Sequence, residues 1–247
     1  MAATEKRVRL DRLLAEQGIA ASRERARALI LAGAVLVDDV IQDKAGTLVD
    51  PGASIRIRSE NNPYVSRGGL KLKGALSAFG IAVGGLVCLD VGASTGGFTD
   101  CLLQEGAVRV YALDVGYGQL AWKLRTDPRV VCIERTNIRY FDGRQLNGPV
   151  DMATIDTSFI SLKLVIPPVL KSLREGGALL ALIKPQFEAG REFVGKNGVV
   201  RDPGVHRTVI AEIEDFCRAR AIEVLGTSES ALAGPAGNRE YFLYARK

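Results

Sequence analysis

The sequence predicts an α/β protein made of a small N-terminal α+β domain and a larger domain with a mostly parallel sheet. Two short helical stretches precede short strand-like segments within the first 60 residues. From Leu86 onward, strand-like and helical stretches alternate, which is typical of a parallel sheet covered by helices on both faces. A glycine-rich segment follows the first of these strands, at the position where such sheets bind their ligands.

The composition indicates a folded protein with a mild basic excess. Of the 247 residues, 47% are hydrophobic, and the formal net charge is +5. This charge is compatible with a polyanionic partner but does not establish one. The N-terminus is charged, and the longest apolar run, Ala178–Ile183, is far shorter than the roughly 20 residues that cross a bilayer. We therefore expect a soluble, cytoplasmic protein that has no membrane partner.

The cysteines and the single histidine argue against a metal centre. None of the four cysteines forms a Cys-x-x-Cys pair, and His206 is the only histidine. We expect buried free thiols and no bound metal. A Ser-His-Asp triad would have to depend on His206 alone.

Residues 1–60 are predicted to form the small domain. Leu10, Leu13 and Leu14 have helical spacing, and Gly18 ends this first helix. Ser22 is placed to cap a second helix. The second helix has apolar positions Ala26, Leu29 and Ile30 and stops at Gly33, and strands are expected at Val35–Val37, Thr47–Val49 and Ser54–Arg58.

Arginines are frequent in these two helical stretches. Arg23 and Arg27 are four residues apart and share one helix face, where guanidinium groups can bind phosphates. Arg9 precedes the first helix. Residues 1–58 contain ten Lys and Arg against eight Asp and Glu, so charge alone leaves a merely solvated surface as the alternative.

Residues 61–66 are predicted to be a linker, and residues 67–247 the larger domain. Helices are expected over Phe98–Glu105 and Val205–Arg220. The strands are expected at Leu86–Val91, Val108–Asp114, Val130–Glu134, Val150–Asp156, Ala178–Lys184, Ile222–Leu225 and Tyr241–Ala245.

The glycine-rich segment 89–100 has the position of a cofactor loop. Its glycines would let the backbone turn tightly and approach a ligand. Position 94 is Ser, so the dinucleotide pattern G-x-G-x-x-G fails, and no P-loop lysine follows. Asp90 precedes the first glycine and suits a cationic ligand, while Asp114, 22 residues after Gly92, is placed to bind ribose hydroxyls. A purely structural turn and a helix-capping acid are the alternatives. The segment resembles the S-adenosylmethionine-binding motif of Rossmann-like methyltransferases, particularly the FtsJ type that methylates ribose.

Four ionisable residues are expected at the carboxyl edge of the sheet. Lys71 precedes the first strand, Asp156 and Lys184 end two later strands, and Glu240 precedes the last strand. A partly buried lysine beside another lysine loses its proton more readily and can serve as a general base for a weakly acidic hydroxyl. We expect Lys184 to be that base, with Lys71 easing its deprotonation. Taken singly, each residue could also be an ordinary surface group at the end of a strand.

Together the motifs resemble one family over essentially the whole chain. Arg9-Leu10-Asp11 and Ser22-Arg23, with the spacing that follows them, resemble the alpha-L RNA-binding fold of the S-four ribosomal protein family. The Ser-Arg-Gly-Gly-x-Lys-Leu segment at 66–72, the loop at 90–99 and Lys-Pro-Gln-Phe-Glu at 184–188 resemble the TlyA, or hemolysin A, family. The order Lys71, Asp156, Lys184, Glu240 matches the tetrad of ribose 2′-O-methyltransferases. One departure is Asn-Asn-Pro-Tyr at 61–64, where some members have Arg-x-Trp-Val, which puts linker control of cofactor binding in doubt.

This resemblance implies S-adenosylmethionine-dependent methylation of cytidine 2′-hydroxyls in ribosomal RNA of the large subunit, the small subunit or both. The partner would be ribosomal RNA or a ribosomal subunit. The cofactor-binding residues implied are Asp90, Gly92, Ser94, Gly96, Phe98, Asp114, Asn137 and Phe159. The RNA-binding residues implied are Arg9, Arg23, Arg27, Arg67, Arg191 and Lys196.

Two other functions stay open at this point. A membrane-lytic hemolysin is disfavoured because the sequence has no spanning segment or strongly amphipathic terminal helix. A non-catalytic RNA-binding protein of ribosome assembly is disfavoured because the tetrad and the glycine loop are intact. The sequence does not give the target nucleotide or the oligomeric state.

Overall fold

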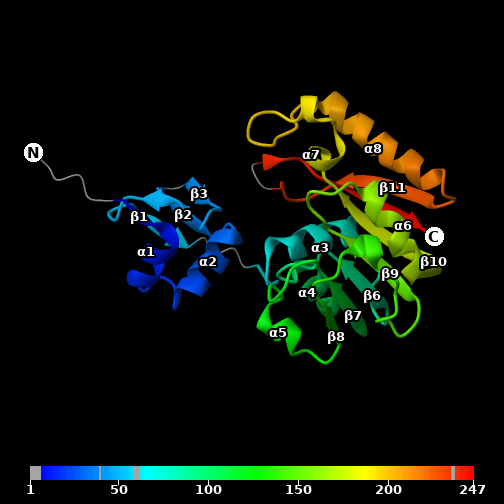
Figure 1. Cartoon of the computed structure of the whole chain (residues 1–247), viewed down its shortest axis with the longest axis horizontal. Helices are drawn as coiled ribbons and strands as arrows, with labels where there is room; N and C mark the ends of the chain where they lie inside the picture. Colours follow the sequence, from blue (N-terminus) through cyan, green and yellow to red (C-terminus); the bar gives the residue numbers. More distant parts are fainter. Residues whose placement is uncertain (1–6, 39, 58–61, 235–236) are drawn as a thin grey trace, which may run out of the picture. The chain divides into compact units, whose positions relative to one another are not determined.

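The computed structural model divides the chain into two compact units, Met1–Pro63 and Tyr64–Lys247 (Figure 1). It describes residues 7–38, 40–57, 62–234 and 237–247. The predicted strand end at Arg58 and the predicted linker start at Asn61 lie outside these residues.

The first unit packs two helices against short strands. Helix α1 spans Leu10–Glu16 and α2 spans Arg23–Leu31. Strands β2 (Val35–Val37), β3 (Val40–Gln42) and β5 (Ile55–Ile57) form an antiparallel sheet in the order β3-β2-β5, and β1 (Val8–Arg9) pairs with β4 (Leu48–Val49). The core of the unit is apolar and includes Leu10, Leu14, Ala26, Ile30 and Val35.

Sequence signals placed the helix ends correctly in this unit. The Ser22 hydroxyl accepts a hydrogen bond from the Arg25 amide at 3.1 Å and caps α2, as predicted. Strands β1 and β3 were not predicted. β1 has only two residues, and Val40 and Ile41 of β3 are exposed, so neither strand shows the alternating burial pattern that identifies a strand in a sequence.

The second unit is built on a seven-stranded sheet in the order β11-β12-β10-β9-β6-β7-β8. Five neighbouring strands are parallel, and β12 runs antiparallel to both of its neighbours. The strands are β6 (Val87–Val91), β7 (Arg109–Leu113), β8 (Val130–Ile133), β9 (Val150–Ile155), β10 (Leu173–Ile183), β11 (Glu223–Glu229) and β12 (Tyr241–Arg246).

Helices cover both faces of this sheet and bury two apolar layers. One layer packs under α3 (Arg67–Phe79), α4 (Gly97–Gln104) and α5 (Trp122–Arg125). The other packs under α6 (Leu162–Ser172) and α8 (Pro203–Arg218). The short helices η1 (Ile138–Tyr140), α7 (Pro185–Glu188) and η2 (Arg191–Phe193) lie in connections. The Rossmann-like α/β class and the small N-terminal α+β domain are thus confirmed.

The central strands β6 and β9 mark the point where the strand order reverses. β6 continues to β7 and β8 on one side, while β9 pairs with its other side. Val91 and Ile155 are register partners at the carboxyl ends of these strands. Gly92 and Asp156 follow directly, so the segments that begin there face the crevice where open α/β sheets bind ligands.

Several elements of the second unit differ from the sequence prediction, among them β11, which extends to Glu229 beyond the predicted end at Leu225. Helix α3 was not predicted, although Lys71 lies on it, because Gly68, Gly69 and Gly74 lower the helical propensity of its sequence. Strand β10 begins five residues before the predicted Ala178, with an irregularity in its register between Leu173 and Ala178. Within the described part of the chain, no helix combines the length and apolarity required to span a membrane.

The Ser22 cap gives a test of the local structure. Replacing Ser22 by Ala removes the acceptor for the Arg25 amide and should destabilise α2 by about 1 kcal/mol. Hydrogen exchange measured on peptides should then show faster exchange in 23–31 and unchanged exchange in α8. Ser22→Asn, which retains a capping oxygen, is the matched control; equal acceleration in both variants would contradict the role of the cap.

Candidate active site

A cavity of about 800 Å³ opens at the carboxyl ends of β6, β7 and β9. This volume lies within the range of small-molecule and cofactor sites, roughly 300–1,000 Å³. Five of the predicted cofactor-binding residues line it: Gly92, Ser94, Asp114, Asn137 and Phe159. Residues that the sequence did not single out also line it, among them Gln119, Thr136, Arg139, Ser158 and Phe187.

The loop after β6 has a shape that only small residues allow. Gly92 has a φ of +86°, and a Cβ there would lie 2.4 Å from the carbonyl oxygen of Asp156. Gly96 has a φ of +96°, and a Cβ there would lie 2.3 Å from Leu124. Both positions therefore require glycine, for the backbone conformation and for the close approach of neighbouring segments.

Asp114 closes this loop from the end of β7. Its carboxylate accepts hydrogen bonds from the Ser94 amide at 2.8 Å and the Gly116 amide at 2.6 Å. Each carboxylate oxygen can accept more than one hydrogen bond, so Asp114 can still bind hydroxyl groups of a ligand. These two amide groups hold the carboxylate at the cavity wall, and the carboxylate in turn stabilises the backbone at Ser94 and Gly116.

Three predicted cofactor-binding residues lie outside the cavity lining. Gly96 faces Leu120 and Leu124. Phe98 is buried in the core of the unit, with its ring centroid 6.0 Å from that of Phe242. Gly96 therefore allows the shape of the loop, and Phe98 anchors the start of α4 in the core, where its side chain has no access to the cavity.

Asp90 is the third, and its carboxyl group is completely buried under the loop. Thr99 and Thr154 donate hydroxyl hydrogen bonds to it at 2.7 and 3.1 Å. Burial raises the pKa of Asp90 to about 7, against the opposing effect of these hydrogen bonds. Its side chain ties the start of α4 to β9, and the expectation of direct contact with a cationic ligand has no support in this geometry.

Asn137 and Phe159 line the cavity from the segments that follow β8 and β9. The Asn137 side-chain oxygen caps η1 by accepting from the Arg139 amide at 3.0 Å. Phe159 has a φ of +62°, is 90% exposed, and its ring lies 4.9 Å from that of Phe187. A large apolar side chain in this backbone conformation is rare and indicates a functional constraint.

The predicted tetrad forms two ion pairs, one buried and one partly buried. Lys71 Nζ on α3 lies 2.6 Å from Glu240 Oε2, which precedes β12. Lys184 Nζ after β10 lies 2.5 Å from Asp156 Oδ1 after β9. Each lysine thus has a carboxylate partner, whereas the sequence analysis expected the lysines to influence each other directly.

One contact in this group was missed. Ser158 accepts a hydrogen bond from Lys184 Nζ at 3.1 Å, and so helps Asp156 to orient the amino group. Ser158 comes two residues after Asp156 in the same segment at the end of β9. This spacing was the one feature of the sequence from which the contact could have been predicted.

Several buried polar atoms around the ion pairs have no hydrogen-bond partner among the described residues. They are Glu240 Oε1, Thr157 Oγ1, Gln186 Oε1 and Arg67 Nε. Buried polar groups in folded proteins are nearly always satisfied, so a cluster of exceptions indicates groups that a ligand or water completes. Gly234 provides the room for Glu240, because a Cβ there would meet Glu240 Oε1 at 2.1 Å.

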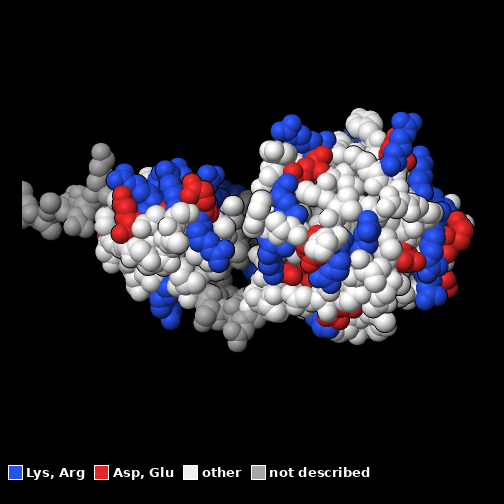
Figure 2. All heavy atoms as spheres, turned by 90° about the horizontal axis from the view of Figure 1, so that it is seen from below, with Lys and Arg blue, Asp and Glu red and all other residues white. Residues whose placement is uncertain are grey.

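The predicted RNA-binding residues are distributed over both units. Arg9, Arg23 and Arg27 lie on the first unit and are exposed or half-exposed. Arg67 is the first residue of α3, one turn before Lys71. Arg191 and Lys196 are exposed on the segment between α7 and α8. Figure 2 shows Lys and Arg on the visible surface of each unit with Asp and Glu among them, so the basic residues do not form one continuous patch on this face.

His206 has a structural environment. Its Nε2 donates to the Val200 carbonyl at 2.9 Å, so its Nδ1 accepts from the Tyr241 hydroxyl at 3.0 Å. Both ring nitrogens are thereby used, and no catalytic triad is built on this histidine. The four cysteines are free thiols, and the described residues contain no cluster of potential ligands that could hold a metal ion.

The chain is similar to known proteins over nearly its whole length. Residues 64–247 match the model of the FtsJ-like methyltransferase family, and residues 8–55 match that of the S4 domain. The chain is 45% identical over 242 residues to the 16S/23S rRNA (cytidine-2′-O)-methyltransferase TlyA of Mycobacterium tuberculosis, covering 98% of this chain and 90% of that protein. It is 40% identical over 239 residues to hemolysin A of Brachyspira hyodysenteriae, covering 96% of this chain and 99% of that protein.

The same two-part organisation occurs in a solved structure. A hemolysin candidate from Streptococcus thermophilus superposes with a TM-score of 0.77 and 43% identity, covering 99% of this chain and 90% of that one.

The burial of Asp90 makes a prediction about stability. An ordinary Asp has a pKa of 3.8, whereas Asp90 in the folded protein has a pKa of about 7. Between these values the folded state binds the proton and the unfolded state does not. The free energy of unfolding should therefore fall as pH rises from about 4 to about 7, by at most about 1.4 kcal/mol per pH unit.

Urea unfolding of the cofactor-free protein at pH 5, 6 and 7.5 measures this effect. The difference between wild type and Asp90→Asn should shift steadily in favour of the variant as pH rises. Asp127→Asn is the control, since Arg129 lowers the pKa of Asp127 and keeps its titration below this window. Parallel pH dependences for wild type and Asp90→Asn would contradict the assignment.

Proposed function

Because this chain belongs to the TlyA/hemolysin A family of FtsJ-like methyltransferases, we propose that it methylates the 2′-hydroxyl of cytidine in ribosomal RNA with S-adenosylmethionine as the donor. The observation that supports this function best is the presence of two ion pairs, Lys71–Glu240 and Lys184–Asp156, at the sheet edge that also carries the cavity. The Mycobacterium tuberculosis relative, whose name states this activity for 16S and 23S rRNA, supports the substrate. A ribosomal substrate places the enzyme in the cytoplasm.

The cavity fits S-adenosylmethionine in size and in chemistry. Asp114 offers carboxylate oxygens to ribose hydroxyls, and the glycine loop at 92–97 offers backbone groups at close approach. Asn137 and Phe159, which also line the cavity, would complete the binding site. The bound cofactor supplies a methyl group made electrophilic by its sulfonium. Asp156 lines the same cavity and pairs with Lys184, so it would connect the cofactor site to the proposed base.

The chain's own residues provide the proton chemistry. Lys184 Nζ, after it has released one ammonium proton to solvent, would accept the proton of the ribose hydroxyl, so that the oxygen can bond to the methyl carbon as the methyl–sulfur bond of the donor breaks. Asp156 and Ser158 orient the amino group and stabilise the ammonium that results. Glu240 keeps one oxygen on Lys71 and one oxygen without a partner, which leaves an acceptor for a hydroxyl of the target ribose.

The first unit supplies RNA affinity in this proposal. Its match to the S4 domain, together with exposed guanidinium groups at Arg9, Arg23 and Arg27, is suited to phosphate contacts on structured RNA. Arg67, Arg191 and Lys196 would extend the contact on the catalytic unit.

The cofactor assignment is tested with Asp114→Ala. Loss of charged hydrogen bonds to ribose hydroxyls should weaken S-adenosylmethionine binding roughly tenfold or more in calorimetry. Asp127→Ala, which removes a carboxylate that pairs with Arg129 away from the cavity, should bind as wild type does. Tighter binding of NAD than of S-adenosylmethionine by the wild-type chain would refute the assignment.

The catalytic assignment is tested with Lys184 variants in single-turnover methylation of bacterial ribosomal RNA. Lys184→Ala should lower the rate by about 10²–10⁴-fold while cofactor and RNA binding persist. Lys184→Arg should fail as well, because a guanidinium stays protonated and cannot accept the hydroxyl proton. Lys163→Ala removes an exposed lysine that pairs with Glu212, and should leave the rate unchanged.

Mapping ribose methylation on both ribosomal RNAs after the wild-type reaction identifies the nucleotide and the subunit. Methylation of a base in place of a ribose, or no methylation at all, would refute the proposed function. A wild-type rate for Lys184→Arg would refute only the general-base role.

A further inference from the structure

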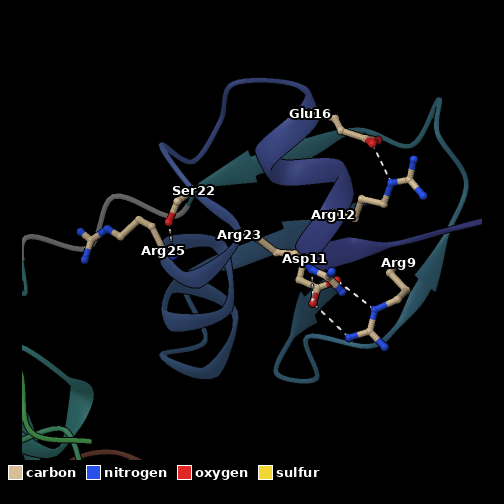
Figure 3. Close-up of polar contacts among 7 residues, drawn as sticks. All are labelled: Arg9, Asp11, Arg12, Glu16, Ser22, Arg23 and Arg25. Carbon is tan, nitrogen blue, oxygen red and sulfur yellow. Dashed lines mark hydrogen bonds and ion pairs between the residues drawn. The ribbon is translucent and has the colours of Figure 1, made fainter. Parts of the chain in front are cut away.

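A buried carboxylate lies beneath the arginines of the first unit. Asp11 is in the first turn of α1, and its side chain is only 1% exposed, beside the core residues Leu10 and Leu14. A carboxylate in such a place is costly unless charged partners satisfy it. Two arginines do so (Figure 3).

The two arginines come from different elements and meet at one carboxylate. Arg9 Nε and Nη2 donate to Asp11 Oδ1 and Oδ2, each at 3.0 Å, which is the forked geometry of a bidentate pair. Arg23 Nε, from the first turn of α2, donates to Asp11 Oδ2 at 3.2 Å. The hydrogen bonds to Arg9, followed by those to Arg23, lower the pKa of Asp11 to about 2, so the carboxylate is ionised at any working pH.

The outer sides of both guanidinium groups remain accessible. The Arg9 and Arg23 side chains are 48% and 52% exposed. Among the described residues, nothing accepts a hydrogen bond from Arg9 Nη1 or from either Nη of Arg23. Two half-exposed cations are thus held by one carboxylate, and their mutual repulsion is offset by a charge that is itself almost inaccessible to solvent.

A second ion pair on the same helix shows what an ordinary surface pair looks like. Arg12 Nε lies 2.6 Å from Glu16 Oε1, but their side chains are 64% and 50% exposed and one turn apart on α1. Figure 3 shows this pair on α1 at a distance from the Asp11 group. Such exposed pairs contribute little and leave both side chains mobile.

We propose that Asp11 is a positioning residue for RNA binding, which holds Arg9 and Arg23 as a preformed bidentate clamp for a backbone phosphate. The inference rests on the proposed function, in that the first unit must bind RNA. Pre-organisation matters because a free arginine loses rotamer entropy when it is immobilised. The phosphate would contact guanidinium groups whose orientation Asp11 has already fixed.

A purely structural role for Asp11 makes a different prediction. Asp11→Asn removes a negative charge beside the RNA surface, so Coulomb attraction alone would tighten RNA binding. A clamp that loses its support should weaken binding in spite of the added positive charge. The sign of the change in affinity therefore separates the two roles.

The experiment measures the affinity of the full chain for labelled bacterial 23S and 16S ribosomal RNA, as a function of salt. Asp11→Asn should bind roughly tenfold more weakly, and its log–log salt slope should fall by about 1, as expected for one lost phosphate contact. The control Glu16→Gln releases Arg12 and adds the same charge, and should bind as tightly as wild type or slightly more tightly. Unchanged or tighter binding by Asp11→Asn, with an unchanged slope, would overturn the clamp.

Two further variants keep the result interpretable. If Asp11→Asn lowers the melting temperature of the first unit into the assay range, Arg9→Lys replaces it, since lysine retains the ion pair but not the fork. This variant should also bind RNA more weakly, with its S-adenosylmethionine affinity unchanged; wild-type RNA affinity would overturn the clamp.

Arg23→Glu with Arg27→Glu tests the proposed function separately. If that double variant leaves RNA affinity intact, the first unit does not bind RNA and the proposed function loses that part. If it weakens binding and Asp11→Asn does not, only the role of Asp11 is wrong.

Discussion

The close approach of two backbone segments at the carboxyl ends of β6 and β9 is the constraint on which the site depends. Gly92 follows β6 with a left-handed φ, and its Cα faces the carbonyl oxygen of Asp156 so closely that no Cβ fits. This contact fixes where the cofactor loop starts and where the segment with Asp156, Ser158 and Phe159 starts. Because the strands are parallel and in register, both segments open toward the same crevice. The start of the loop and the position of Asp156, which pairs with Lys184, thus depend on this backbone contact.

The charged side chains at this edge of the sheet occur as two ion pairs. Lys71 and Glu240, like Lys184 and Asp156, are brought together from distant parts of the chain, and an unpaired charge in either position would carry a large desolvation cost. The pairs are nevertheless incomplete, since Glu240 Oε1 has no hydrogen-bond partner among the described residues. An acceptor that is buried and unsatisfied is unfavourable for stability and useful for binding a hydroxyl. Under the proposed function, a hydroxyl of the target ribose would satisfy Glu240 Oε1.

The sequence allowed the fold class and most elements to be predicted, because strand burial and helix caps leave local patterns. Ser22 and the strand-end positions of Asp156 and Lys184 are of this kind. The sequence could not show α3, where glycines mask a helix that tertiary packing stabilises, or that each lysine of the tetrad has its own carboxylate partner. Partner choice depends on three-dimensional proximity and not on spacing. The same applies to Asp90, whose position before a glycine suggested ligand contact, while its hydrogen bonds to Thr99 and Thr154 place it beneath the loop.

In both units, a carboxylate holds a long cationic side chain, but for different purposes. In the catalytic unit, Asp156 pairs with the buried Lys184 amino group, which under the proposed function would be oriented toward the reacting hydroxyl. In the first unit, a buried carboxylate holds two arginines so that their outer donors have one orientation toward a phosphate. For Asp11, as for Glu240 in the catalytic unit, the carboxylate is more deeply buried than the cation that it holds, so water competes little for it. The entropic cost of orienting a long cationic side chain is then met during folding and does not recur when RNA binds. This explains why exposed pairs such as Arg12–Glu16 are not equivalent to the buried ones, although their distances are similar.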